Sequence, residues 1–172
     1  MIPFFDHLSD IRLLVLDVDG VLTDNSVICT EDGHLLRTMH VRDGYAMFTA
    51  LKEGIQILII TGGNSSGVTK RLKNIGDGSI EVFTGIRQKL PVLEKYCKEN
   101  NFQSHEVLYM GDDILDISVM KWSGASACPI DAIPEVKAIS QYICNNEGGK
   151  GCVREVIEII LKHQNKWLNS NI

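Results

Sequence analysis

An apolar run that ends in two acidic residues constrains the fold of this chain more than any other stretch. The predicted strand covers residues 11–16, and Asp17, Val18, Asp19 and Gly20 follow it directly. Residues two apart on a strand point to the same side, so the carboxylates of Asp17 and Asp19 should converge where the strand ends. Two carboxylates at one point repel each other and favour a divalent cation. A plain Asp-Gly turn after a buried strand explains the same residues, and only the chain downstream can separate the two interpretations.

Strand-like and helix-like segments alternate along the rest of the chain. Short apolar runs typical of buried strands lie at 55–60, 80–83, 107–110, 125–128 and 142–144. Apolar residues at helical spacing predict helices between or after these strands. Three of the helices cover 44–53, about 88–100 and about 153–167; two others end at about 75 and about 122, and one begins at Pro134. This alternation predicts an α/β fold, a doubly wound parallel sheet with helices on both faces. Since no linker or repeat divides the chain, residues 1–172 are expected to form a single domain.

Two segments lie outside this alternation. Residues 24–42 are predicted to form a β-hairpin that turns at Glu31-Asp32-Gly33 and returns from Leu35 to Val41. This insertion is too short to be a cap domain, but it could serve as a flap or as an assembly surface. Near the C-terminus, a glycine-rich tail leads into the last helix, and the two together cover about residues 146–168.

Composition excludes several classes of function. The formal net charge is −5, and no basic stripe is present, which argues against a nucleic-acid partner. The longest apolar runs are far shorter than a membrane span, so no membrane segment is expected. Five cysteines are scattered without a C-x-x-C pair, as expected for reduced thiols and a cytoplasmic protein.

Polar residues follow three of the predicted strands at the point where each strand ends. They are Asp17 with Asp19, Thr61 with Gly62, and Asp112 with Asp113. In doubly wound folds ligands bind outside the carboxyl ends of the strands, so these clusters should meet at one place. That coincidence favours a functional site over a set of unrelated turns.

The acidic residues suit phosphoryl transfer assisted by a metal ion. Asp17 is the candidate nucleophile, because a carboxylate that attacks phosphorus forms an acyl phosphate and divides hydrolysis into two easier steps. Asp19 is the candidate general acid and base. Mg²⁺ would offset the negative charge, held by the carboxylates of Asp17 and Asp112 and by the backbone carbonyl of Asp19. Asp113 would orient a water molecule bound to the metal.

Neutral and cationic groups complete the predicted site. Thr61 and the amides of Gly62 and Gly63 could donate hydrogen bonds to phosphate oxygens, although Thr61 could equally cap the following helix. Lys89 could neutralise Asp17 and the phosphate, although a lone lysine is usually solvated surface. Asp116 could be no more than an acid favoured by a helix N-terminus.

Taken in order, the motifs Asp-x-Asp-Gly-Val, Thr-Gly, Lys and Gly-Asp-Asp-x-x-Asp resemble those of the haloacid dehalogenase superfamily of phosphohydrolases. Finer features resemble its 3-deoxy-D-manno-octulosonate 8-phosphate (KDO 8-phosphate) phosphatases: residues 17–24, Val41-Arg42-Asp43-Gly44-Tyr45, and Gly148-Gly149-Lys150-Gly151. The resemblance implies a capless core with Mg²⁺, a sugar phosphate substrate, homotetramers joined by their hairpins, and a role in lipopolysaccharide synthesis. It also implies a set of substrate contacts, namely Asp19, His40, Val41, Arg42, Asp43, Gly44, Arg71 and Lys89.

The chain departs from this family at two positions. Gly63 stands where many members carry arginine, and Phe48 stands where they carry a basic residue. Both departures concern recognition of the sugar acid rather than the phosphate chemistry.

Three alternatives share parts of this pattern. A phosphatase for a nine-carbon 2-keto acid phosphate would use the same catalytic groups. A non-catalytic tetramerisation domain, like those fused to sialic-acid-activating enzymes, would not need the acidic and basic residues that are intact here, namely Asp17, Asp19, Lys89 and Asp112. A receiver domain also uses acids, threonine and lysine, but its phosphorylated aspartate follows the third strand rather than the first.

Overall fold

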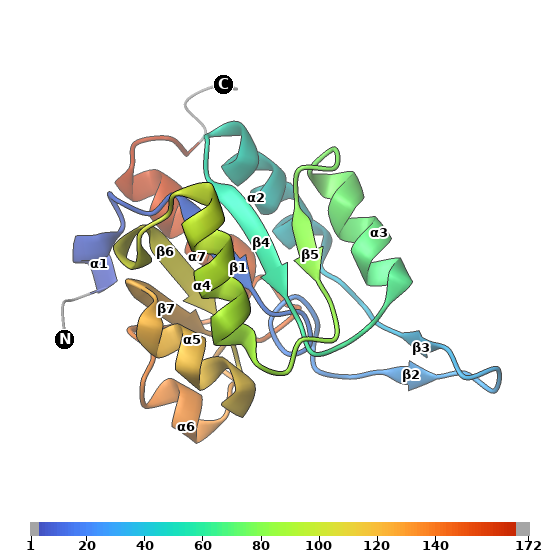
Figure 1. Ribbon diagram of the computed structural model, residues 1–172. Helices are drawn as coiled ribbons and strands as arrows, with labels where there is room; N and C mark the ends of the chain where they lie inside the picture. Colours follow the sequence, from blue (N-terminus) through green and yellow to red (C-terminus); the bar gives the residue numbers. More distant parts are fainter. Residues whose placement is uncertain (1–3, 168–172) are drawn as a thin grey trace.

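A six-stranded parallel sheet forms the centre of the molecule, shown here by a computed structural model that describes residues 4–167 (Figure 1). The sheet order is β5-β4-β1-β6-β7-β8, and every pairing is parallel. The strands are β1 (Leu13–Leu16), β4 (Gln56–Ile60), β5 (Glu81–Phe83), β6 (Val107–Met110), β7 (Ala125–Cys128) and β8 (Tyr142–Ile143). Because β1 pairs with β4 on one side and β6 on the other, the predicted α/β class is confirmed and the Asp17 loop leaves from the middle of the sheet.

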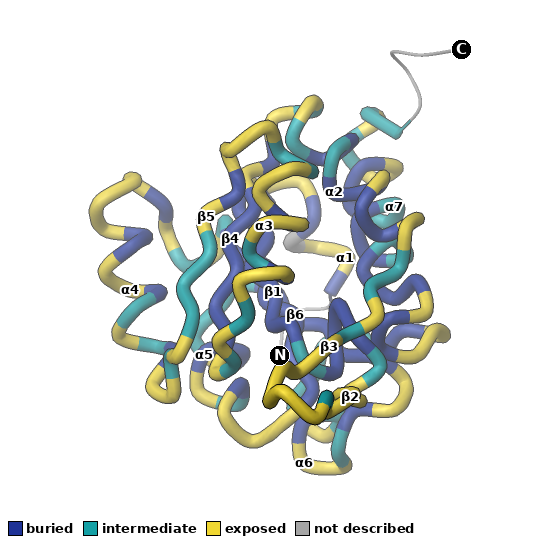
Figure 2. The backbone as a smooth tube through the Cα atoms, turned by 90° about the vertical axis from the view of Figure 1, so that its right-hand side faces the viewer, coloured by how far each residue is buried: buried dark blue, intermediate teal, exposed yellow. Residues whose placement is uncertain are grey.

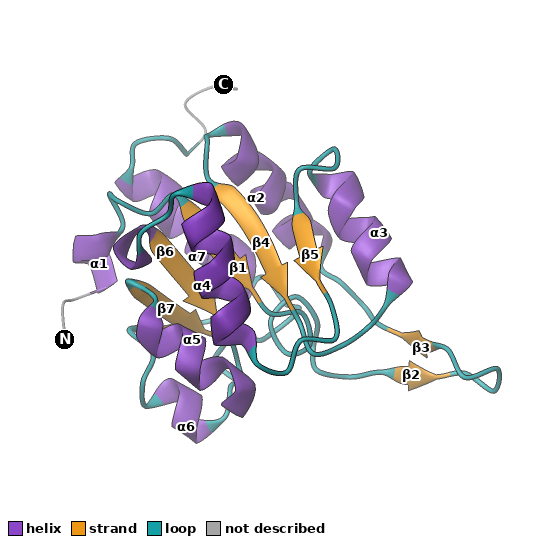
Figure 3. Ribbon diagram, viewed as in Figure 1, coloured by secondary structure: helices purple, strands orange, loops and turns teal. Residues whose placement is uncertain are grey.

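Helices cover both faces of the sheet (Figure 3). Leu14 and Leu16 of β1 belong to one buried cluster, while Leu13 and Val15 belong to the other, as the alternation of a strand requires. The first cluster includes residues of α1 (Phe4–His7), α2 (Val41–Lys52), α3 (Ser66–Ile75) and α7 (Cys152–His163). The second includes residues of α4 (Lys89–Asn100), α5 (Ile117–Trp122) and α6 (Pro134–Lys137). Two 3₁₀ turns, η1 (Ser104–Glu106) and η2 (Ile114–Asp116), flank β6.

Two helix boundaries differ from those expected. α2 begins at Val41 rather than Gly44, so the hairpin does not extend to 42. The early start places Asp43 in the first turn of α2, where an acidic side chain is favoured. α7 ends at His163 rather than Trp167, because Asn165 adopts a left-handed conformation with φ 56° and turns the chain. Leu168, the last residue of the predicted tail, lies outside the described residues.

The hairpin is much shorter than the segment that carries it. β2 (Ile28–Cys29) and β3 (Leu35–Leu36) pair antiparallel as a separate two-stranded sheet. This sheet projects from the body of the molecule beyond the carboxyl ends of the central strands (Figure 1), and its tube is almost wholly exposed (Figure 2). Ile28 is 63% exposed and Leu36 52%, so two large apolar side chains face solvent in a single chain.

None of the helices within residues 4–167 combines the length and the apolar character needed to cross a membrane.

Candidate active site

A cavity of about 380 Å³ lies at the carboxyl ends of the central strands. Its walls come from the loops that follow β1, β4 and β6, together with the start of α4. The lining residues are Asp17, Asp19, Asn25, Thr61, Gly62, Gly63, Arg87, Lys89, Asp112, Asp113, Leu115 and Asp116. The strand-end clusters predicted from the sequence therefore surround one space.

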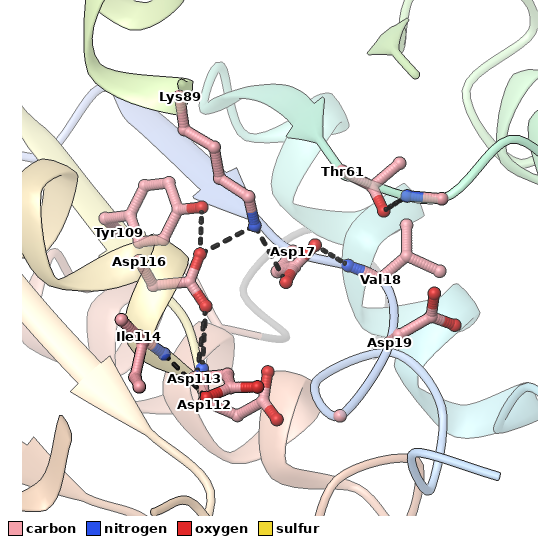
Figure 4. A network of polar contacts seen from close by, with 12 residues as sticks. Asp17, Val18, Asp19, Thr61, Lys89, Tyr109, Asp112, Asp113, Ile114 and Asp116 are labelled. Carbon is pink, nitrogen blue, oxygen red and sulfur yellow. Dashed lines mark hydrogen bonds and ion pairs between the residues drawn. The ribbon is translucent and has the colours of Figure 1, made fainter. Parts of the chain in front are cut away.

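Lys89 is buried between two carboxylates (Figure 4). As the first residue of α4, it is only 1% exposed, and its Nζ lies 2.8 Å from Asp17 Oδ2 and 2.7 Å from Asp116 Oδ1. Burial lowers the pKa of this lysine, but the two carboxylates outweigh that effect and raise the pKa above its ordinary value. The solvated-surface interpretation of Lys89 is therefore wrong. The ammonium stays charged and faces Asp17.

Asp17 is held in one orientation by two donors. Its Oδ2 faces Lys89, and its Oδ1 accepts the backbone N–H of Val18 at 2.7 Å. Burial raises the pKa of Asp17 to about 6, the charge of Asp116 adds to the rise, and Lys89 opposes it. A fixed carboxylate that is ionised at neutral pH is what nucleophilic attack on phosphorus requires.

Asp116 organises the rest of the charged cluster. It is fully buried, and its Oδ1 accepts the Tyr109 hydroxyl at 2.7 Å in addition to Lys89. Its Oδ2 accepts the backbone N–H groups of Asp112 at 3.1 Å and Asp113 at 3.3 Å. Asp116 is thus more than an acid at a helix N-terminus, and its spacing in Gly-Asp-Asp-x-x-Asp is the sequence signal that identifies it. Asp113, predicted to orient a metal-bound water, is exposed and caps the 3₁₀ turn through Ile114 N.

The two oxygens of Asp112 differ in their partners, because Oδ2 accepts a hydrogen bond from Asn25 Nδ2 at 3.4 Å while Oδ1 accepts none among residues 4–167. The carboxylate is buried. Burial, followed by the charges of Asp116 and Asp17, raises the pKa of Asp112 to about 8. Gly20, with φ +86°, packs so closely that a Cβ there would lie 2.0 Å from Asp112 Oδ2. The chain thus brings the Asp17–Gly20 loop directly against a carboxylate with one unsatisfied oxygen.

These carboxylates fit a hard divalent cation. Ligand oxygens of Asp17, Asp112 and Asp116 lie within 4.8 Å of one another. Each oxygen of Asp116 already accepts two hydrogen bonds, whereas each oxygen of Asp17 has one partner and Asp112 Oδ1 has none among residues 4–167. Asp17 and Asp112 therefore keep the lone pairs that an ion needs. Oxygen donors that are desolvated and carry excess negative charge suit Mg²⁺.

Asp17 and Asp19 line the same cavity, but different groups hold their side chains. The chain leaves β1 and turns at once, with the N–H groups of Val21, Leu22 and Thr23 near the carbonyl of Val18, so strand alternation no longer applies. In Figure 4 the Asp19 side chain lies apart from Lys89 and Asp116, with Val18 between them.

The partner of Asp19 is Arg37, which sequence reasoning missed. Arg37 Nε lies 2.6 Å from Asp19 Oδ1, and Nη2 lies 3.2 Å from Oδ2. Eighteen residues separate the two, and Arg37 follows β3, so only the fold of the hairpin segment brings them together. The sole signal in the sequence is an arginine that follows the apolar pair Leu35-Leu36 in the return arm. Arg87, which lines the cavity, was also missed.

Thr61 lines the cavity and does not cap a helix. Ser65 caps α3 instead, because its Oγ accepts the N–H of Val68. Thr61 Oγ1 accepts a hydrogen bond from the N–H of Gly63 at 3.1 Å. The Gly63 amide, which was predicted to bind phosphate, is therefore already engaged. The Thr61 hydroxyl proton and the Gly62 amide remain as donors beside the cavity.

The other predicted substrate contacts lie elsewhere in the single chain. His40 and Arg42 line a second cavity of about 400 Å³ beside the start of α7. Asp43 is buried, and its Oδ1 accepts the N–H of Arg154 at 2.7 Å, so it caps α7. Val41 is 73% exposed. Gly44 packs against Arg71, whose Nη2 would lie 3.1 Å from a Cβ at that position.

Comparison with known proteins agrees with this geometry. The family model of haloacid dehalogenase-like hydrolases matches residues 46–157. The KDO 8-phosphate phosphatases KdsC of Salmonella typhi and of Escherichia coli K12 are each 36% identical to this chain over 158 residues, which is 92% of this chain and 83% of theirs. This chain belongs to the haloacid dehalogenase-like hydrolases. Within them it is KdsC-like, and it is a phosphoric monoester hydrolase.

Solved structures of this KdsC-like group superpose on nearly the whole chain. The KDO 8-phosphate phosphatase of Yersinia pestis matches with a TM-score of 0.92 and 32% identity, over 96% of this chain and 89% of that one. That of Moraxella catarrhalis, solved with a magnesium ion, a phosphate ion and a KDO molecule, matches with a TM-score of 0.89 and 33% identity, over 94% and 92%. Together with the acidic cluster, these matches identify Mg²⁺ as the cofactor.

Proposed function

We propose that this KdsC-like phosphatase hydrolyses KDO 8-phosphate to KDO and inorganic phosphate through an aspartyl-phosphate intermediate. The observation that carries the chemistry is the buried Asp17–Lys89 pair beside the unpaired oxygen of Asp112. The similarity to KdsC enzymes over 92% of the chain supports the substrate.

In the first half of the reaction, an Asp17 carboxylate oxygen attacks phosphorus and the bond from phosphorus to the sugar oxygen breaks. Asp19, in its protonated form, gives its proton to that leaving oxygen. Lys89 and the donors of Thr61 and Gly62 hold the phosphoryl oxygens while negative charge develops on them.

In the second half, water attacks the phosphorus of the aspartyl phosphate. Asp19 takes a proton from that water, so that inorganic phosphate leaves and the carboxylate of Asp17 is restored. Mg²⁺ bound by Asp17, Asp112 and the backbone carbonyl of Asp19 would neutralise the carboxylates and the phosphate, which otherwise repel each other. Asp113 has the further proposed task of orienting a water of that ion.

Assembly supplies the substrate contacts that the single chain leaves outside the cavity. We infer a homotetramer joined through the hairpins, whose apolar residues are exposed in one chain. In that assembly, residues 40–44 and Arg71 would help to enclose a neighbouring active site, and so would the glycine-rich tail. All five cysteines are free thiols, which suits a cytoplasmic enzyme of lipopolysaccharide synthesis.

A phosphate-release assay over a panel of sugar phosphates tests the substrate. The panel contains KDO 8-phosphate, a nine-carbon 2-keto acid 9-phosphate and a neutral aldose phosphate, each with Mg²⁺. We expect the largest kcat/KM for KDO 8-phosphate. A larger value for the nine-carbon acid would reassign the substrate, and no release from any of the three would contradict the proposal.

A further inference from the structure

Asn25 reaches the active-site cavity from the exposed loop that leads from β1 to β2. Its φ is 63°, in the left-handed region that few residues other than glycine adopt. Its Nδ2 donates a hydrogen bond to Asp112 Oδ2 at 3.4 Å. The chain thus takes an uncommon backbone conformation at the residue whose carboxamide contacts a predicted metal ligand, and such conformations concentrate at functional sites.

The glycine-rich segment before α7 braces the loop that carries Asn25. The carbonyl of Val21 accepts the N–H of Gly149 at 2.9 Å. Asp24 Oδ2 lies 3.7 Å from Lys150 Nζ. The position of Asn25 relative to the cavity is therefore fixed by contacts on the residues that precede it.

Asn25 and Gly20 give the two oxygens of Asp112 different surroundings. Oδ2 accepts the amide of Asn25, and a Cβ on Gly20 would lie 2.0 Å from Oδ2, so the carboxylate has no room to turn toward the Gly20 backbone. Oδ1 is buried and has no hydrogen-bond partner within residues 4–167. Asp112 therefore offers one free oxygen to an ion, while its other oxygen is engaged.

We propose that Asn25 makes Asp112 a one-oxygen ligand and thereby selects Mg²⁺ over Ca²⁺. The inference rests on the proposed ligation by Asp112 and is independent of which sugar phosphate is hydrolysed. Mg²⁺ requires near-ideal octahedral geometry with ligands at about 2.1 Å, whereas Ca²⁺ takes roughly six to eight oxygens at longer distances and often both oxygens of one carboxylate.

The preference follows from what the amide of Asn25 occupies. The two oxygens of one carboxylate lie too close together to fill two octahedral positions, so engaging Oδ2 removes nothing that Mg²⁺ would use. The same hydrogen bond removes a ligand that Ca²⁺ would use. Asn25 is thus a positioning residue that acts through Asp112, and it has no contact with the reacting phosphate in this account.

Asn25→Gly removes the amide and keeps the backbone, because glycine adopts a positive φ freely. Titration calorimetry of the metal-free protein with Mg²⁺ and with Ca²⁺, at one pH, measures the effect. We expect the Kd for Ca²⁺ to fall about tenfold, because Oδ2 is freed from a hydrogen bond to a charged group, and the Kd for Mg²⁺ to change little. The preference for Mg²⁺ should therefore fall about tenfold.

Asn101→Gly is the matched control. Asn101 is also a left-handed asparagine, with φ 58°, and it follows the last residue of α4, whose first residue is Lys89. The control therefore makes the same substitution in the same backbone conformation at the end of α4 away from the cavity. It should leave the affinities for both ions unchanged.

Equal changes in the two affinities of Asn25→Gly would show that Asn25 supports the fold of the site without selecting the ion, and no change in either would also overturn the inference. In both cases the proposed phosphatase function stands. If Asp112→Asn binds Mg²⁺ as tightly as wild type, the proposed ligation by Asp112 is wrong, and this inference with it. Should Asn25→Gly fail to fold, Asn25→Asp decides the question. It keeps the size of the side chain but cannot donate to Asp112, and it should shift the preference toward Ca²⁺ in the same direction.

Discussion

The active-site cavity and the β2–β3 hairpin dispose their side chains in opposite ways. The cavity buries charges: Lys89, Asp17 and Asp116 are nearly inaccessible, and each is held by specific partners. The hairpin exposes apolar residues such as Ile28 and Leu36, joined by two residue pairs. Charged groups are costly to bury and apolar groups are costly to expose, so both regions have an unfavourable arrangement that a bound ligand or a partner chain would relieve.

The difference shows which parts of the enzyme one chain completes. Within the charged cluster, the unsatisfied oxygen of Asp112 is available to bind a cation. At the base of the hairpin, Arg37 pairs with Asp19 of the cavity wall, while the hairpin itself projects from the body of the molecule (Figure 1). We therefore expect the phosphate chemistry to need only the single chain, and substrate selection to depend on assembly.

The largest effect should come from breaking the charged cluster at its centre. Asp17→Asn should remove nearly all turnover, a loss of about 10⁴-fold or more, because an amide cannot form the acyl phosphate. Circular dichroism and melting should show an intact fold. Asp77→Asn, at an exposed turn with φ 49° that asparagine adopts readily, is the matched control and should remain active. Turnover of Asp17→Asn within tenfold of wild type would contradict the role of Asp17.

A smaller effect should appear in the competition between protons and Mg²⁺. The folded protein raises the pKa of Asp112 to about 8 and that of Asp17 to about 6. Because the folded state holds these protons more tightly than the unfolded state, the contribution of the two groups to the stability of the metal-free protein should be greatest below pH 4 and should fall as pH rises toward 8. Since Mg²⁺ requires the ionised form, its affinity should rise roughly tenfold per pH unit between pH 6 and 8. Titration calorimetry measures this directly.

Asp112→Asn provides the control for that titration. The variant should bind Mg²⁺ weakly and should lose the pH dependence between pH 6 and 8. EDTA should silence the wild-type enzyme. A Mg²⁺ affinity that does not change across this pH range would show that Asp112 does not bind the ion.

The smallest effect should come from the hairpin. Replacing Ile28 and Leu36 together by serine should convert the proposed tetramer to monomers in analytical ultracentrifugation, because these side chains are exposed in the single chain. We expect kcat/KM for KDO 8-phosphate to fall about tenfold, and turnover of p-nitrophenyl phosphate to fall less. A tetramer that survives the double replacement would place the assembly surface elsewhere.

The sequence predicts the sheet and the cavity well because both depend on local patterns. The runs at 107–110 and 125–128 are the strands β6 and β7 to the residue, and Asp17, Thr61 and Asp112 follow strands that the parallel topology brings side by side. Such placement requires only strand periodicity and the rule that ligands bind at carboxyl ends.

Contacts between distant loops could not be predicted in this way. The Arg37–Asp19 pair and the cap that Asp43 provides for α7 depend on how loops turn after regular elements end. Strand alternation predicts that Asp17 and Asp19 face the same cavity, but it does not predict that Asp19 pairs with Arg37. The unpaired oxygen of Asp112 is likewise a property of the packed structure, since it reflects which donors are absent from the surrounding residues 4–167.

Trapping the intermediate tests the central claim most directly. Wild-type enzyme turning over KDO 8-phosphate with Mg²⁺ is quenched in acid, reduced with borohydride and digested for mass spectrometry, so that an aspartyl phosphate is converted to homoserine. We predict homoserine at position 17, dependent on substrate and absent from Asp17→Asn. Homoserine at Asp19 or Asp112 instead, or full turnover with no modified peptide under conditions that trap a known aspartyl phosphate, would contradict nucleophilic catalysis by Asp17.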